Sequence, residues 1–234
     1  MILILSLLLS SALARETELH WSVCEKSSAK ILKKLDLKIK KEEERETSYL
    51  DTARLTQYQA GTTLRLRDSD EDGRVSTVKI SFDSYPEVDA SWYELEDFKC
   101  EEDLYGSKPH YSCSLDYSSS ARNNKTSFSD DQREFIAEYA NRDVEWDALK
   151  KHGPVRDRVW KLGKIDGMEI KLESMKLPDG SEFYELSTRV PHAQTETAHR
   201  KLSREWDNRD ITLCDEQESK TKQVLDYFKA ALRN

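Results

Sequence analysis

The sequence predicts an α+β protein built on an antiparallel eight-stranded closed or nearly closed β-barrel (tunnel) with helices packed outside. At least six segments alternate apolar with polar or charged residues at the two-residue period of a strand. Acids and bases also interleave from strand to strand on the polar faces, and amphipathic segments are available to cover the apolar faces. A closed barrel satisfies both conditions, because its polar faces line an interior and its apolar faces lie under helices.

The first fourteen residues, MILILSLLLSSALA, form an apolar segment that ends in a small-x-small pattern and is too short to span a bilayer. We interpret residues 1–14 as a signal peptide of a secreted or periplasmic protein, and residues 15–234 as one domain. The absence of Lys or Arg before the apolar run leaves a truncated start or a buried first strand as alternatives.

The first half of the domain reads as strands around one short helix. Residues 16–23 alternate as a strand, residues 27–37 form a short helix that Ser27 or Ser28 caps, and the charged residues 38–52 form a second strand. The segment 61–83 is a hairpin in which Arg65, Arg67 and Lys79 lie opposite apolar residues. Residues 91–98 follow as a strand that carries Glu94 and Glu96 on one face.

The second half begins with an irregular loop over 100–127, rich in Ser, Asn and Tyr. A capping box predicts a helix from residue 130, and a second helical piece covers about 144–151. Strands are expected over 155–162, 167–177 and 181–190, then a helix over 195–208, a short strand over 211–214 and a C-terminal helix from residue 220.

The four cysteines form an even set in what we interpret as an exported chain, so two disulfides are expected among three possible connectivities. We favour Cys100 with Cys113, which flank a short polar stretch, and Cys24 with Cys214, which would tie the first strand to a late one. Zinc is the alternative, but no CxxC or HxxxH spacing supports it.

Charge restricts the class of ligand. The chain has 37 Lys and Arg against 45 Asp and Glu, a net charge of −8, which argues against a general nucleic-acid binder. An anion site must therefore be local. The polar strand faces that would build it are those of Glu16, Glu18 and His20; Arg65 and Arg67; Lys79; Glu94 and Glu96; Arg156 and Arg158; Glu173; and Glu185.

In order along the chain, ETELHW, SYLDT, LRLR, TVK, YELE, RDRVW, FYELS and SKTKQVL resemble the motifs of the CYTH, or triphosphate tunnel metalloenzyme, superfamily. The resemblance covers nearly all of residues 16–232. It implies an eight-stranded tunnel in which basic residues hold a triphosphate or polyphosphate and carboxylates hold a divalent metal, Mg²⁺ or Mn²⁺. It also implies a metal-dependent phosphohydrolase that acts on inorganic tripolyphosphate or an organic triphosphate. From the net charge and the shortness of the apolar segment, we expect no nucleic acid as partner and no stable membrane insertion.

The resemblance assigns roles residue by residue. The implied metal ligands are Glu16, Glu18, Glu173 and Glu185; the implied phosphate ligands are Arg65, Arg67, Lys79, Arg156, Arg158 and Lys220; the implied catalytic residues are His20, Glu94 and Glu96. Three positions depart from the family pattern: His20 replaces a Lys, Trp92 stands where an Arg is common, and Ser187 replaces an acid. The alternative function is therefore a catalytically degenerate tunnel that binds polyphosphate or another anion.

Overall fold

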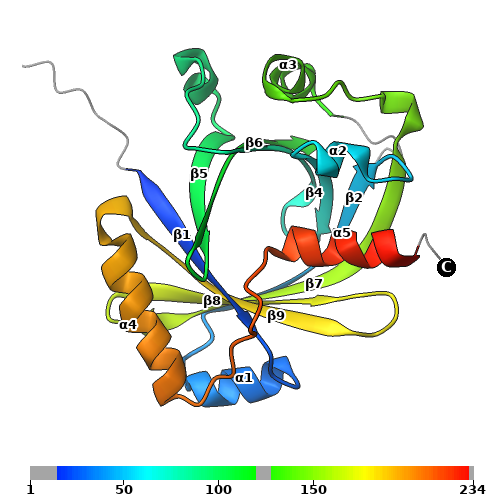
Figure 1. Ribbon diagram of the computed structural model, residues 1–234. Helices are drawn as coiled ribbons and strands as arrows, with labels where there is room; N and C mark the ends of the chain where they lie inside the picture. The colour runs from blue at the N-terminus through cyan, green and yellow to red at the C-terminus, as the bar shows by residue number, and fades with distance from the viewer. Residues whose placement is uncertain (1–14, 120–127, 232–234) are drawn as a thin grey trace, which may run out of the picture.

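The computed structural model describes residues 15–119 and 128–231, and within them nine strands close into one barrel (Figure 1). The predicted signal peptide lies outside the described residues. The strands follow the order β1-β5-β6-β4-β3-β2-β7-β8-β9 around the barrel. Their bounds are β1 Glu16–Val23, β2 Lys41–Asp51, β3 Thr62–Ser69, β4 Gly73–Phe82, β5 Phe98–Tyr105, β6 Lys108–Ser119, β7 Lys150–Ile165, β8 Met168–Lys176 and β9 Glu182–Pro191.

The predicted closed barrel is confirmed, with two differences. It contains nine strands in place of eight, and β1 pairs with β5 in parallel, whereas all other neighbouring strands are antiparallel. The parallel pair closes the barrel and brings the polar face of β1 beside that of β5.

The helices lie outside the barrel wall or at its end (Figure 1). The α-helices are α1 Ser28–Leu35, α2 Thr56–Gln59, α3 Asp130–Tyr139, α4 Thr195–Asn208 and α5 Lys220–Ala231, and the 3-10 helices are η1 Ala90–Glu94, η2 Trp146–Ala148 and η3 His192–Gln194. Ser27 caps α1, and Ser129 with Gln132 forms the predicted capping box of α3. No helix in the described part of the chain is both long and apolar enough to cross a membrane.

The strand expected over 91–98 and the loop expected from residue 100 are both wrong. Residues 90–94 form η1, because the buried ring of Trp92 packs against Phe98 and Phe135 outside the barrel. The strand starts only at Phe98, and β5 and β6 form a hairpin over residues 98–119. The second helical piece expected near 144–151 is only the short η2, and the expected strand over 211–214 is only a bridge between Val23 and Leu213.

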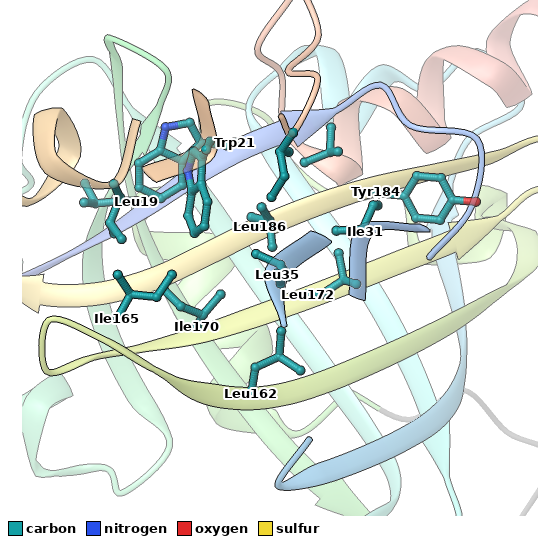
Figure 2. Packing of buried hydrophobic residues seen from close by; sticks show 14 of the residues in the cluster. Leu19, Trp21, Ile31, Leu35, Leu162, Ile165, Ile170, Leu172, Tyr184 and Leu186 are labelled. Carbon is teal, nitrogen blue, oxygen red and sulfur yellow. The ribbon is translucent and has the colours of Figure 1, made fainter. Parts of the chain in front are cut away.

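Apolar side chains on the outer strand faces pack under the helices. In the largest cluster, Ile31 and Leu35 of α1 pack by Leu172 and Leu186 of the barrel wall (Figure 2). Trp21 of β1 packs edge-on against Trp206 of α4. A second cluster places Leu64, Leu66, Val78 and Ile80 under α3 and η1. Because alternate residues on a strand face opposite sides, this outer packing turns the residues between them into the barrel.

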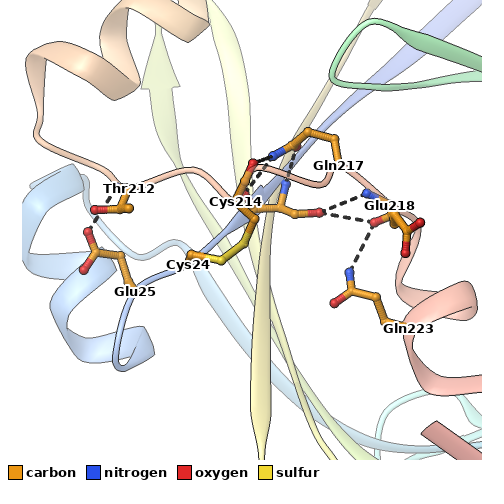
Figure 3. The surroundings of a disulfide bond; sticks show 8 residues. Cys24, Glu25, Thr212, Cys214, Gln217, Glu218 and Gln223 are labelled. Carbon is orange, nitrogen blue, oxygen red and sulfur yellow. Dashed lines mark hydrogen bonds between the residues drawn. A yellow bond between two sulfur atoms is a disulfide. The ribbon is translucent and has the colours of Figure 1, made fainter. Parts of the chain in front are cut away.

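Both favoured disulfides are present. Cys100 and Cys113 join directly opposed residues of β5 and β6. Cys24 and Cys214 join the end of β1 to the segment that precedes α5 (Figure 3). In that segment the Gln217 side chain accepts from the Ser22 backbone N–H at 2.8 Å and donates to the Ser22 carbonyl at 3.2 Å. The covalent bond and these hydrogen bonds fix where α5 begins.

Candidate anion-binding tunnel

The basic residues of the β3–β4 hairpin face the interior of the barrel, as their spacing predicts. Leu64, Leu66 and Val78 belong to the outer cluster, so Arg65 and Arg67 of β3 and Lys79 of β4 lie on the opposite, inner face. Apolar packing outside the wall therefore holds three cations inside it.

Arg65 and Arg67 have no acidic partner among the residues that the structure describes, 15–119 and 128–231. Arg65 Nη2 donates to Thr77 Oγ1 at 3.0 Å, and the buried Nε of each arginine has no hydrogen-bond partner. Burial, then repulsion from Arg65 and Arg45, lowers the pKa of Arg67 to about 10. A half-buried cation whose buried Nε has no partner is costly, so this pair is arranged to receive an anion.

A chain of alternating charges runs from Lys79 across the interior. Lys79 Nζ donates to Asp103 Oδ2 at 3.1 Å, and the other oxygen of Asp103 lies 3.3 Å from His20 Nε2. His20 Nδ1 lies 2.9 Å from Glu185 Oε1. Burial alone would lower the pKa of His20, but the carboxylates of Glu185 and Asp103 have the larger combined effect and raise this pKa to about 9. His20 therefore carries a positive charge at neutral pH, as the Lys of the family pattern would.

Glu18 is held by two cations that the sequence interpretation did not include. Lys171 Nζ lies 3.0 Å from Oε1 of Glu18, and Arg189 Nη2 lies 2.7 Å from its Oε2. Burial raises the pKa of Glu18, but Lys171, His20 and Arg189 lower it well below its usual range overall. The sequence could have indicated these two cations, because Lys171 shares a strand face with Glu173, and Arg189 shares one with Glu185.

Lys220 enters the interior from the first residue of α5. Its Nζ lies 2.6 Å from Glu185 Oε1 and 2.9 Å from Glu173 Oε2. Arg45 of β2 lies 3.2 Å from Glu173 and donates to Asp157 at 2.6 Å. Burial and the charge of Glu173 raise the pKa of Asp157 to about 6. Arg45 belongs to the charged strand expected over residues 38–52, to which we had assigned no site residue, and the resemblance had assigned no role to Asp157.

Arg156 and Arg158 lie on the outer face of β7, contrary to the expectation that they face inward. Arg158 forms ion pairs with Glu42 and Glu44 on the neighbouring strand, and Asp157 between the two arginines is the residue that faces the interior. Both arginines line an open groove of about 1110 Å³ together with Glu44, Glu46 and acidic residues of the β3–β4 turn, and the inward residues Arg45 and Asp157 also border this groove. Charges of both signs therefore surround the two arginines at this end of the barrel.

Three acidic residues lie away from the interior cluster. Glu94 and Glu96 are exposed on η1 and the turn after it, outside the wall, and Glu16 is exposed at the first residue of β1. The inward acids of the middle hairpin are Glu101 and Asp103 of β5, which the motif comparison missed because it matched YELE rather than KCEED. The Cys100–Cys113 pair indicated this strand, since it demands that two chain segments lie side by side there.

One group in the described residues brings metal-ligand atoms together: Glu18, His20 and Asp103 each offer an atom within 4.8 Å of the others. This is a possible metal site, but its atoms already have partners. Both oxygens of Glu18 accept from Lys171 or Arg189, and both nitrogens of His20 face carboxylates. A charged imidazole with both nitrogens engaged has no lone pair for a metal. The group as folded does not fit a divalent ion.

The tunnel interior opens at the end that α5 borders. A cavity of about 290 Å³ lies there, lined by inward residues such as Lys79 and Tyr105 and by residues 217–219 of the segment before α5. Tyr105 stacks on His20 with ring centroids 4.5 Å apart, so it forms one wall between this opening and the charged interior. The opening gives a polar ligand a route toward Lys79.

Comparison of the sequence with protein-family models and with curated proteins finds no match. Comparison with solved structures finds similar folds at low identity. HpAC1 from Hippeastrum, a candidate adenylyl cyclase with a dominant triphosphatase activity, is 12% identical over 90% of this chain and 95% of its own, with a TM-score of 0.61. A candidate adenylate cyclase from Bacillus halodurans is 12% identical over 89% and 96%, with a TM-score of 0.53. PH1819 from Pyrococcus horikoshii is 15% identical over 91% and 99%, with a TM-score of 0.50. The chain therefore shares the fold of these structures, and the barrel fold that the motif resemblance implied is confirmed.

Proposed function

We propose that this protein binds a triphosphate or short polyphosphate chain inside its barrel. The observation that carries the proposal is the pair Arg65 and Arg67, two inward guanidinium groups without an acidic partner in the described residues. Guanidinium groups bind phosphate oxygens through paired, charge-assisted hydrogen bonds, and Lys79 lies on the adjacent strand. A chain of linked phosphates would offer separate phosphate oxygens to each of the two arginines.

The fold and the disulfides support this proposal from other directions. The barrel resembles that of HpAC1, whose dominant activity is that of a triphosphatase. The two disulfides fit an oxidising compartment, and we propose that the protein acts outside the cytoplasm, as a secreted or periplasmic protein.

Calorimetric titration with sodium tripolyphosphate tests the proposal. We expect saturable binding to the wild type and a loss of about 1 to 3 kcal/mol in Arg65→Met, the usual contribution of a charge-assisted hydrogen bond. Arg158→Met is the matched control, because this arginine lies on the outer face and should leave the affinity unchanged. Equal losses in both variants, or no binding to the wild type, would contradict the proposal.

A phosphohydrolase acting on tripolyphosphate or an organic triphosphate is the second candidate. The activity of HpAC1 and the inward carboxylates Glu18, Glu173 and Glu185 favour it. Phosphoryl transfer depends mainly on positioning and on neutralising charge, and the cationic interior provides both. A phosphate-release screen over triphosphates, with Mg²⁺, with Mn²⁺ and with chelator, decides between hydrolysis and binding alone.

A further inference from the structure

We infer that the tunnel binds its phosphate chain without a divalent metal, because side-chain cations of the protein hold the carboxylates that would otherwise bind one. This inference rests on the proposed function and specifies its cofactor requirement. It runs against the expectation of Mg²⁺ or Mn²⁺ that the family resemblance supports.

The first part of the argument is the saturation of Glu18. Its two oxygens accept separately, one from Lys171 of β8 at 3.0 Å and one from Arg189 of β9 at 2.7 Å. The two donors come from different strands and converge on one carboxylate with an exposed fraction of only 10%. A divalent ion at Glu18 would have to displace one of these cations and then lie beside it, which like-charge repulsion disfavours.

The second part is the placement of Lys220. Its ammonium lies between two buried carboxylates on adjacent strands, 2.6 Å from Glu185 and 2.9 Å from Glu173. Bridging two carboxylates is the role that a hard divalent cation would have at this point of the wall. Lys220 is held there by the start of α5, which the Cys24–Cys214 disulfide ties to β1.

The third part is that the acids leave little negative charge for a metal. His20 lies between Asp103 and Glu185, and Arg45 contacts both Glu173 and Asp157. Each of these carboxylates has a cation within hydrogen-bond distance. One oxygen each of Asp157, Glu173 and Glu185 has no hydrogen-bond partner, although that of Glu173 lies 3.2 Å from Arg45 Nη2. None of the three residues belongs to a set of three converging ligands within the described residues. The interior therefore offers a divalent ion no open set of ligands, while Arg65 and Arg67 offer an anion two open donors.

The first test measures metal binding directly, without a phosphate ligand. Titration of the wild-type protein with Mn²⁺, followed by electron paramagnetic resonance, should show no site of submillimolar affinity. The double variant Lys171→Met with Arg189→Met frees both oxygens of Glu18, and its Mn²⁺ affinity should rise by at least about tenfold, since affinity follows ligand charge. Lys176→Met with Arg158→Met is the matched control, because both residues are exposed on the outer wall and should change nothing. Tight Mn²⁺ binding to the wild type, or no gain in the folded double variant, would overturn the inference.

The second test uses the wild type alone, so it does not depend on a variant that folds. Tripolyphosphate should bind in the presence of chelator, and Mg²⁺ should not strengthen binding, because it neutralises the ligand that the arginines attract. Binding only with Mg²⁺ or Mn²⁺ would overturn this inference and leave the proposed function intact. No binding under either condition would overturn the proposed function itself, so the two failures are distinguishable.

Discussion

Replacing Arg67 by Met should stabilise the fold and weaken phosphate binding at the same time. Burial, then repulsion from Arg65 and Arg45, lowers the pKa of Arg67 from 12.5 to about 10, so the folded state disfavours its charge. The shift corresponds to about 3 kcal/mol at 1.36 kcal/mol per unit, and we reduce it to about 1 to 3 kcal/mol because the side chain is only half-buried. Removal of the charge at neutral pH should recover that free energy, since the cost is fully present below the folded pKa.

Thermal unfolding and calorimetry measure the two effects on one sample. An increase of about 1 to 3 kcal/mol in the free energy of unfolding should raise Tm by about 2 to 10 °C in a domain of this length. The free energy of tripolyphosphate binding should weaken by about 1 to 3 kcal/mol. Arg158→Met, on the outer wall, should show neither change. If Arg67→Met unfolds at a lower temperature than the wild type, or binds tripolyphosphate as tightly, then the charge of Arg67 neither destabilises the free protein nor binds the anion, and the reasoning is refuted.

Three further outcomes are expected. The folded-state pKa of His20 is raised to about 9, so the contribution of the charged imidazole to the free energy of unfolding is fully present below pH 6.5. About 2 to 3 kcal/mol of that free energy should be lost as the pH rises to about 9. Denaturant unfolding should show this pH dependence in the wild type and not in His20→Gln. Removing the Cys24–Cys214 bond with paired Ser variants should lower the free energy of unfolding by about 3 to 5 kcal/mol, because the bond closes a separation of 190 residues, and thiol titration of the unreduced, denatured wild type should find no thiol. Glu94→Gln with Glu96→Gln should leave tripolyphosphate binding unchanged, and a loss of affinity there would place η1 in the site.

The inner residues of β3 and β4 could be predicted from the sequence because their outer faces are continuous apolar stripes. Leu64, Leu66 and Val78 had to be covered, so Arg65 and Lys79 had to face inward. The same rule failed on β7, where Val155 and Val159 are buried on the inner face and the exposed arginines lie outside. Near the ends of a barrel apolar residues also face inward, and a one-residue error then reverses every side chain of the strand.

The contacts between charges could not be predicted, because they depend on which strands are neighbours. His20 meets Asp103 only because β1 pairs in parallel with β5, and Glu18 meets Lys171 across β9. Nothing in either segment specifies this closure. The pair of inward acids in the middle of the chain was assigned to the wrong segment for a related reason. YELE at residues 93–96 and KCEED at residues 99–103 both alternate like strands, and the packing of Trp92 against Phe135 outside the wall is what keeps the first segment out of the barrel.

A crystal structure of the wild-type protein with tripolyphosphate, grown in the presence of chelator, tests the central claim most directly. The account predicts a linked phosphate chain inside the barrel with oxygens on Arg65 and Arg67, the terminal phosphate toward Lys79, and the Glu18 pairs with Lys171 and Arg189 intact. A phosphate chain bound only to Arg156 and Arg158 on the outer face of β7, or an empty barrel that fills only when Mg²⁺ is added and displaces Lys171, would contradict it.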